Sequence, residues 1–479
     1  MAARVRYPTR MRWWACASRL VFVCSALATG SRAQDCADVV AAAEALGART
    51  GVAVADASGR VLFGSRVGEV FAPASNLKVL TAAAVLDGLG ADAEFVTRFV
   101  LRDGRLVVQA SGDPNWIHDT EHAPERVFAA VAASLQRAGV TRLGGVDLEV
   151  GPFVGPLRPP GWPADQHYTY YCAPTGPFVL EQGTFVLSVA AQGDAAEVGL
   201  VAPPAALPIR GSIDVVARRK GAVYGAIDRG DAIEVRGRIH RSSPPVRIRT
   251  AMQDPTAWYR ATLVAALARQ GVTVHEGADV AVADRVVHEH RSPLRTAVQR
   301  MLEDSSNFDA EQCLRVLGAR QRGDGSLAGG LVALRERLAA RLGHVPAGVV
   351  LTDGSGLSAD NRVTPGLLTA ALLATAAGPA GAVLVDCLPV AGRSGTLADR
   401  FDGTDLVGRV RAKTGWIRGA SALCGVLERR DGSRRWFTIL MNYDPAKNGL
   451  NKDLKALQER LVAAIDALEV PAAAPGGGR

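Results

Sequence analysis

Strand patterns stand near both ends of this 479-residue chain, with a long segment of different character between them. Residues 51–63 predict a β-hairpin, and the runs 421–427 and 436–441 predict two more strands. Residues 96–290 show short alternating strands, Gly and Pro breaks and few long helices. A sheet shared by both ends requires a discontinuous domain. We therefore expect an α/β (α+β) fold in which one domain, built from both ends of the chain, is interrupted by β-rich insertions.

Helical patterns flank these strands. Apolar residues at helical spacing predict helices over 37–47, 75–87, 295–303, 308–320, 326–342, 364–377 and 454–468. The chain is longer than one hydrophobic core usually covers, so about two or three domains are expected.

The first 33 residues have the pattern of a secretory signal. Arginines precede the apolar run 20–28, and Ser31-Arg32-Ala33 provides the small residues that a signal peptidase recognises, with cleavage before Gln34. The run is too short to span a bilayer comfortably, and no second apolar segment of about 18 residues follows. We expect export to the periplasm or cell envelope, without a permanent membrane anchor.

The net charge of +8 does not indicate a nucleic-acid partner. Six arginines and no acids lie in the first 33 residues, so the rest of the chain carries only +2. With 48% hydrophobic and 21% charged residues the chain is globular rather than disordered, collagen-like or coiled-coil.

Five cysteines would remain after cleavage: Cys36, Cys172, Cys313, Cys387 and Cys424. None forms a C-x-x-C pair, so neither a zinc site nor a thioredoxin-type site is indicated. An odd number of widely separated thiols permits one or two disulfides and specifies none. The favoured interpretation is that they are small buried hydrophobic residues.

Ser75-Asn-Leu-Lys78 has the residue types that nucleophilic catalysis requires. A serine hydroxyl attacks only when a neighbouring base takes its proton. On a helix Lys78 lies one turn beyond Ser75 on the same face, and a desolvated amine can serve as that base. Ser75 at the start of the helix also places its own backbone N–H where an acyl oxyanion would form.

Two later motifs complete a set. Ser305-Ser-Asn307 and Lys413-Thr-Gly415 follow Ser75-x-x-Lys78 in the order known from β-lactamases and penicillin-binding proteins. Lys413-Thr-Gly415 stands at the end of a strand-like run, so a strand is predicted over 406–412 just before the motif. The Lys413 ammonium and the Thr414 hydroxyl could hold a substrate carboxylate. Gly415 would allow close backbone approach, and the Trp416 N–H could be a second oxyanion donor.

The use of lysine strengthens this interpretation. The chain has six lysines against 49 arginines, and two of the six stand at motif positions 78 and 413. Arginine cannot lose its proton, so a base at position 78 has to be lysine. In the alternative, Ser75 is a helix cap and both lysines are solvated charges.

Two other hydrolase classes are disfavoured. His118-Asp-Thr-Glu-His122 fits the H-x-x-E-H pattern of inverted zinc peptidases, but Gly and Pro residues crowd the segment and predict a loop rather than the required helix. His288 and His290 alternate in a polar stretch and are expected at solvated strand positions. No G-x-S-x-G elbow occurs, which disfavours a Ser-His-Asp hydrolase.

Longer segments carry a family resemblance, which runs from about residue 40 to 465. The matching segments are Pro73-Ala-Ser-Asn76, Gly112-Asp-Pro114, Gly161-Trp-Pro163, Asp353-Gly-Ser-Gly-Leu-Ser358 with Asn361, and Ala391-Gly-Arg-Ser-Gly-Thr-Leu397. On these the chain resembles the class C low-molecular-mass penicillin-binding proteins, the D-alanyl-D-alanine carboxypeptidase/endopeptidase family with a large insertion.

The resemblance implies a transpeptidase/β-lactamase-like domain, with an antiparallel sheet flanked by helices and two nested β-rich domains. The expected boundaries are 1–33 for the signal peptide, 34–95 with 291–470 for the catalytic domain, 96–165 with 250–290 for insertion domain II, 166–249 for insertion domain III, and 471–479 for a disordered tail.

The resemblance also implies roles. Ser75 would be the nucleophile, Lys78 the general base and Ser305 a proton relay, while Asn307 would orient the substrate amide. D-Ala-D-Ala stem peptides of peptidoglycan would acylate the serine, release D-Ala and be hydrolysed, and penicillin would acylate the same serine. No metal or organic cofactor is expected. A non-catalytic scaffold that binds cell-wall peptides and a β-lactamase-like esterase remain alternatives.

Three residues depart from the family pattern. Leu77 replaces a hydroxyl residue, Ser306 replaces an acid or amide, and Trp416 is large beside the expected oxyanion hole. The region 148–153 matches the acidic insertion segment of the family poorly. These departures bear on substrate preference.

Overall fold

The computed structural model describes residues 31–204, 207–217, 223–277, 283–447 and 449–469. Most of the expected signal peptide (1–30) and the expected tail lie outside the described residues. Residues 31–33, which hold the expected cleavage site, are in the first turn of helix α1 (Ser31–Ala45).

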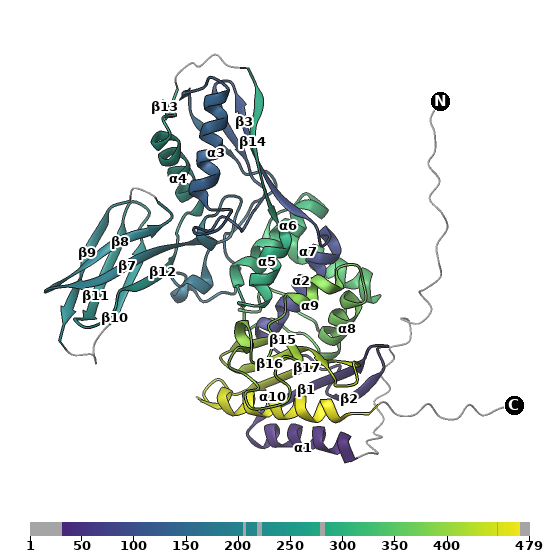
Figure 1. Cartoon of the computed structure of the whole chain (residues 1–479). Coiled ribbons are helices and arrows are strands. Elements are labelled where there is room, and N and C mark those ends of the chain that lie inside the picture. Colours follow the sequence, from purple (N-terminus) through teal and green to yellow (C-terminus); the bar gives the residue numbers. More distant parts are fainter. Residues whose placement is uncertain (1–30, 205–206, 218–222, 278–282, 448, 470–479) are drawn as a thin grey trace, which may run out of the picture.

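One antiparallel sheet joins the two ends of the chain. Its order is β15 (Val410–Ile417), β16 (Ala420–Glu428), β17 (Arg434–Tyr443), β1 (Ala48–Asp56) and β2 (Val61–Ser65). The early strand β1 pairs along its whole length with the late strand β17, which places the purple and yellow segments side by side (Figure 1). The expected hairpin, the two late strands and the α/β fold class are confirmed.

The expected strand at 406–412 begins later than predicted. The structure places strand β15 at Val410–Ile417, so Lys413-Thr-Gly415 lies inside the strand and not after it. Pairing with β16, which sets Lys413 opposite Cys424 and Gly415 opposite Ala422, extends the strand through the motif.

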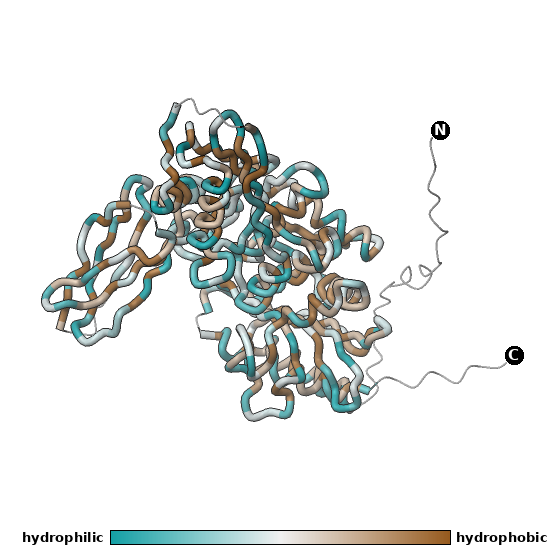
Figure 2. Tube along the Cα trace, turned by 45° about the horizontal axis from the view of Figure 1, so that its top comes forward, coloured by the Kyte–Doolittle hydropathy of each residue, from teal (hydrophilic) through white to brown (hydrophobic). Residues whose placement is uncertain are grey.

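Helices cover both faces of this sheet. α1 and α10 (Leu450–Ala467) lie on one face and form a core with its strands. On the other face are α2 (Leu77–Leu89), α5 (Leu294–Leu302), α6 (Asn307–Arg322), α7 (Leu327–Leu342), α8 (Pro365–Ala376) and α9 (Gly381–Asp386). These helices bury a second, larger apolar cluster, which appears as brown tube at the centre of the molecule (Figure 2). The seven expected helices of this domain are present, with ends that differ from the prediction by up to six residues.

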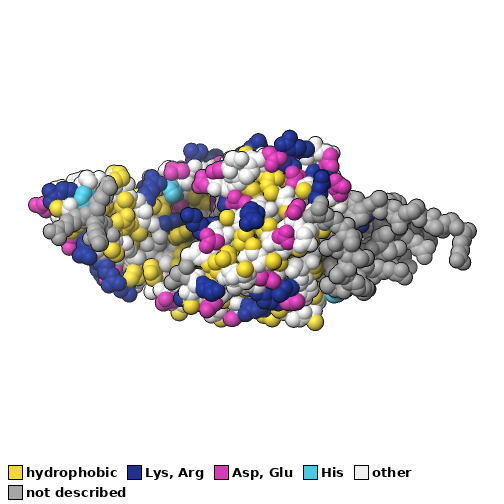
Figure 3. All heavy atoms as spheres, turned by 90° about the horizontal axis from the view of Figure 1, so that it is seen from below, with side chains coloured by type: hydrophobic (Ala, Val, Ile, Leu, Met, Phe, Trp, Pro, Cys, Tyr) yellow, Lys and Arg dark blue, Asp and Glu magenta, His cyan; other side chains and the backbone are white. Residues whose placement is uncertain are grey.

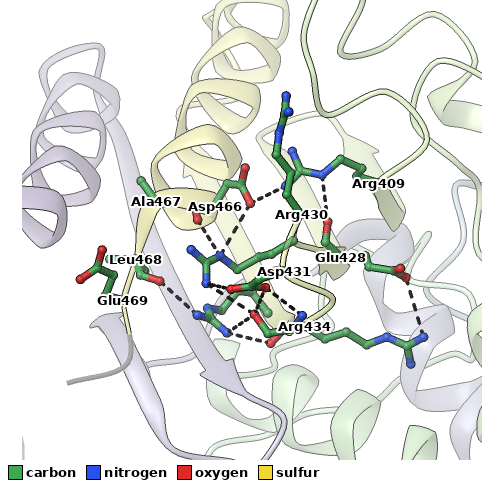
Figure 4. A network of polar contacts seen from close by, with 12 residues as sticks. Arg409, Glu428, Arg430, Asp431, Arg434, Asp466, Ala467, Leu468 and Glu469 are labelled. Carbon is green, nitrogen blue, oxygen red and sulfur yellow. Dashed lines mark hydrogen bonds and ion pairs between the residues drawn. The ribbon is translucent and has the colours of Figure 1, made fainter. Parts of the chain in front are cut away.

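Arginines on or beside the sheet strands donate hydrogen bonds to the C-terminal end of α10. Arg409 donates to the Asp466 carboxylate (2.6 Å), Arg429 donates to the Asp466 carbonyl oxygen (2.9 Å), and Arg435 donates to the Leu468 carbonyl oxygen (3.1 Å) (Figure 4). Donors at a helix C-terminus satisfy carbonyls that have no partner within the helix. From the side of α1 and α10, acidic and basic side chains are interspersed with hydrophobic ones (Figure 3).

The first inserted unit combines a four-stranded sheet with two helices. Its sheet has the order β14 (Arg285–Pro293), β3 (Glu94–Arg102), β4 (Arg105–Gln109), β6 (Val146–Glu149), with a small pair β13 (Thr273–Val274) and β5 (Arg142–Leu143). Helices α3 (Pro124–Arg137) and α4 (Pro255–Arg269) pack against it. The predicted β-rich segment with few long helices holds for residues 96–290 as a whole, but neither α3 nor α4 was itself predicted. Pro124 and Pro255 are each the first helical residue, where proline starts a helix rather than breaking one.

The second inserted unit is a six-stranded sheet between residues 184 and 251. Its order is β10 (Val223–Asp228), β11 (Ile233–His240), β9 (Ile209–Val216), β8 (Ala195–Ala202), β7 (Thr184–Gln192) and β12 (Val246–Ala251). It projects from the body beside α4 (Figure 1). Short 3-10 helices lie between these elements: η2 (Ala74–Asn76), η3 (Ala164–Gln166), η4 (Tyr170–Cys172), η5 (Glu181–Gly183) and η6 (Gly395–Leu397).

The five cysteines after residue 33 are free thiols with buried side chains. The interpretation of these residues as small buried hydrophobic side chains is confirmed. Among the described residues, no helix combines the length and the apolar character that a membrane span needs.

Candidate active site

Ser75 lies on η2, one turn before the buried helix α2. The preceding Ala74 has a φ of 48°, in the left-handed region that side chains rarely adopt. Gly356 lies very close to that residue: a Cβ added at position 356 would be 1.8 Å from the Ala74 carbonyl oxygen. The backbone just before Ser75 is therefore in a strained conformation and lies against a neighbouring loop, as is common at functional sites.

The Lys78 amine has three hydrogen-bond partners. Its Nζ is 3.0 Å from Ser75 Oγ, 2.7 Å from Asn307 Oδ1 and 2.7 Å from the Ser355 carbonyl oxygen. Two of these partners are carbonyl oxygens, which only accept. A neutral amine therefore gives its two N–H groups to Asn307 and Ser355, and its lone pair is left facing the Ser75 hydroxyl.

Burial favours the neutral form of this amine. The Lys78 side chain is fully buried, and desolvation lowers its pKa to about 7, against an opposing effect of Asp353 and Glu311. An amine with this pKa can take up a proton near neutral pH.

In the second motif, Asn307 at the start of α6 contacts the lysine, and Ser305 in the preceding loop does not. Asn307 Oδ1 accepts from Lys78, and its Nδ2 donates to the Tyr171 carbonyl oxygen (2.9 Å). Ser305 has a φ of 61°, and its hydroxyl has no hydrogen bond within the described part of the chain. Its expected role as a proton relay remains a prediction. Ser306 is the N-cap of α6, where its Oγ accepts from Asp309 N (3.1 Å), which explains a hydroxyl residue at this departure from the family pattern.

Strand β15 closes the other side of the site. Lys413 is fully buried, and desolvation together with the charge of Lys78 lowers its pKa well below the ordinary value. Its Nζ donates to the Thr414 carbonyl oxygen (2.9 Å). A Cβ on Gly415 would meet the Pro73 carbonyl oxygen at 3.0 Å and Asn76 N at 3.2 Å, so glycine permits the strand to lie against η2.

Trp416 does not fill the site. Its side chain is 58% exposed. The Ala412 N–H donates to the Pro389 carbonyl oxygen at the outer edge of β15 (3.0 Å), and the direction of N–H groups alternates along a strand. The N–H groups of Thr414 and Trp416 therefore point to that same edge, as an oxyanion donor on this strand would have to.

Two loops outside the three motifs also contribute contacts to the site. Ser355, on the loop 353–358, supplies a carbonyl to Lys78, and Asp353 holds that loop by accepting from Gly356 N and Ser358 N (both 2.7 Å). On the second loop, the Thr396 hydroxyl is 2.8 Å from the Thr414 hydroxyl. The sequence assigned neither loop a contact in the site; the Ser355 contact is made by a backbone carbonyl, which leaves no mark in residue identity.

No metal centre is indicated. Within the residues that the structure describes, no group of three or more His, Cys, Asp or Glu side chains could hold a metal ion. His118 and His122 lie in a turn before α3, as expected, and His118 Nδ1 is 2.6 Å from Glu181 Oε2. The expectation of solvated histidines on β14 was wrong for His290, which is buried with its ring 4.7 Å from that of Trp116, because the inserted helices cover that face of the strand.

The fold is that of a penicillin-binding protein. The crystal structure of penicillin-binding protein 4 from Haemophilus influenzae is similar over 91% of this chain and 99% of its own, with a TM-score of 0.76 and 21% identity. A second structure of that protein, in complex with a novel β-lactam, has a TM-score of 0.72.

Sequence comparison identifies the family. A D-alanyl-D-alanine carboxypeptidase of Actinomadura sp. (strain R39) is 32% identical over 83% of this chain and 78% of its own length. A carboxypeptidase of Mycobacterium tuberculosis is 31% identical over 79% and 72%. The profile of the D-Ala-D-Ala carboxypeptidase 3 (S13) family matches residues 33–462, and the chain belongs to this family of peptidases.

Proposed function

We propose that this protein is an exported serine-type D-Ala-D-Ala carboxypeptidase and endopeptidase, which acts on peptidoglycan stem peptides through an acyl-serine and is inhibited by penicillin. The observation that carries the proposal is the buried Lys78 amine, 3.0 Å from Ser75 Oγ and bound by two carbonyl oxygens. The relatives named as D-alanyl-D-alanine carboxypeptidases support the substrate class.

Acylation follows from this arrangement. Ser75 Oγ attacks the carbonyl carbon between the two D-alanines while its proton passes to Lys78 Nζ. The oxyanion that forms is held by the backbone N–H groups of Ser75 and Trp416. The C–N bond then breaks, the leaving amine takes the proton through Ser305, and an ester on Ser75 remains. Water hydrolyses this ester by the same route and returns the proton to the serine.

The buried Lys413 explains selection for a free carboxylate. Its ammonium form is disfavoured by burial, and Lys78 adds to this effect. A terminal carboxylate would add an opposite charge beside the buried amine, with Thr414 as a further donor. Asn307 would orient the substrate amide from the facing side, and Gly415 lets the substrate strand approach β15. The chemistry needs no metal or organic cofactor.

Penicillin labelling tests the proposal. A fluorescent penicillin should label the purified protein covalently, and peptide mapping should place the adduct on Ser75. The Ser75→Ala variant should lose both this label and the release of D-Ala from a D-Ala-D-Ala peptide. Labelling that persists in this variant would show that a different residue is the nucleophile.

The same assay separates the alternatives. A scaffold would bind the peptide without releasing D-Ala. A β-lactamase-like esterase would hydrolyse penicillin faster than the peptide. A metallopeptidase would lose activity on chelation and keep it in Ser75→Ala. Cleavage of cross-linked muropeptides distinguishes endopeptidase from carboxypeptidase activity, because both use one acyl-enzyme.

A further inference from the structure

Helix α6 reaches Lys78 by two routes. Asn307, its first residue, contacts the amine directly. Glu311 lies four residues later, and so one turn along the same face. It is fully buried, and its two carboxylate oxygens are 2.9 and 3.0 Å from Gly354 N.

The loop that Glu311 binds carries the second partner of the lysine. Gly354 is followed by Ser355, whose carbonyl oxygen is 2.7 Å from Lys78 Nζ. The other side of Gly354 is fixed from α2, where Thr81 Oγ1 donates to its carbonyl oxygen (2.6 Å). The loop is thus clamped between α6 and α2.

We propose that Glu311 is a positioning residue for Lys78: it accepts from Gly354 N and so fixes the Ser355 carbonyl against the amine. This inference rests on the proposed function of Lys78 as the base. It assigns to α6 a role in orienting that base through the loop 353–358.

The surrounding charges are few and identifiable. Lys78 faces Glu311 from α6, Asp353 from the loop and Lys413 from β15. Glu311 faces Asp353, Lys78 and, on its own helix, Arg315. Burial and Asp353 raise the pKa of Glu311 to about 8, so Lys78 and Glu311 exchange protons in the same pH range.

Glu311→Ala tests the contact, because alanine leaves Gly354 N without its acceptor, whereas glutamine keeps the shape and one acceptor. Penicillin acylation should slow by roughly tenfold in Glu311→Ala and should be largely retained in Glu311→Gln. Because Glu311 holds its proton up to about pH 8, glutamine leaves the charge beside Lys78 unchanged near pH 7, and the acidic limb of the pH profile should stay in place. An unchanged acylation rate in Glu311→Ala would overturn the proposal.

Two further variants separate the contact from the chemistry of the carboxyl group. Thr81→Val releases the same loop at Gly354 from the side of α2, so acylation should slow as it does in Glu311→Ala. Glu311→Asp keeps the carboxyl group on a shorter side chain, so it should slow acylation more than Glu311→Gln does. A faster rate in Glu311→Asp than in Glu311→Gln would contradict positioning through Gly354.

Thermal unfolding gives a second readout that needs no reaction with penicillin. Between about pH 4.3, where an unfolded glutamate titrates, and pH 8, folded Glu311 binds a proton that the unfolded chain has released, so folding weakens as pH rises. The Tm of Glu311→Gln relative to the unmodified protein should therefore rise from pH 5 to 8. If penicillin never reacts, the proposed function fails. A pH-independent Tm difference contradicts the role of Glu311 alone.

Discussion

At the scale of single residues, the site is defined by what surrounds one amine. Lys78 is fully buried, and the oxygens of Asn307 and Ser355 occupy its two N–H groups. Both oxygens would also bind an ammonium, so they do not select the neutral form. Burial selects the neutral form, because desolvation disfavours the charged ammonium. The two effects together leave the amine oriented and able to accept the proton of Ser75.

The rate of penicillin acylation should follow the neutral fraction of Lys78. Because its pKa is about 7, the rate should fall about tenfold per pH unit below that value and level off above it. Lys78→Arg, which cannot lose its proton, should reduce acylation by about 1000-fold across the range. Lys452→Arg on the exposed face of α10 is the matched control and should behave as the unmodified protein. Stopped-flow labelling over pH 5–9 checks both expectations, and a pH-independent rate would contradict them.

At the scale of elements, the site depends on backbone segments that touch without side chains between them. The loop 353–358 lies on Ala74, and β15 lies on η2, each through a glycine. Asn76 strengthens the second contact: with its amide nitrogen toward the Lys413 carbonyl oxygen (2.9 Å), its oxygen accepts from backbone N–H groups of β16. Close approach of this kind fixes the position of Ser75 relative to Lys413.

Gly356→Ala should abolish acylation and lower stability by about 2–4 kcal/mol, since it adds a clash with the Ala74 carbonyl oxygen to a positive φ of 79°. Gly343→Ala is the matched control. Its φ is 86°, but nothing lies within 4 Å of the added Cβ, so it should cost only about 1 kcal/mol and leave acylation intact. Chemical denaturation and penicillin labelling measure the two effects. Equal losses in both variants would show that the contact with Ala74 is unimportant.

At the scale of the whole molecule, the insertions are part of the site. Tyr171 accepts from Asn307, and the Trp162 Nε1 donates to Asp353 (3.0 Å). Gln182, just before β7, donates to Asp309 (2.6 Å), which also binds Arg300. Three parts of the inserted segment thus reach the loops that carry Asn307 and Ser355.

Gln182→Ala should slow acylation by roughly 3–10-fold and lower stability by about 1 kcal/mol, because it removes a hydrogen bond to a buried carboxylate near the Ser305 loop. Gln192→Ala, at the far end of β7, is the control: its exposed side chain bonds only Glu197 among the described residues, and neither quantity should change. Labelling kinetics and Tm are the measurements. An unchanged rate in Gln182→Ala would mean that the second insertion does not act on the site.

The sequence by itself was sufficient to select Ser75 and Lys78 as candidates, because no other residue type can replace their chemistry. Ser75 and Lys78 are separated by one helical turn, and their local spacing is enough to bring a hydroxyl and an amine together. The hairpin and the late strands were also predictable, since hydrophobic alternation is local, whereas α3 and α4 were missed because proline at a helix start resembles a break.

Only the tertiary structure decided which groups meet Lys78. The Ser355 carbonyl and Glu311 come from segments more than 200 residues away from it in the chain. The contact from the second motif is made by Asn307 and not by Ser305. Backbone carbonyls carry no residue signature, and burial, which moves the pKa of Lys78, exists only after distant segments have packed around it.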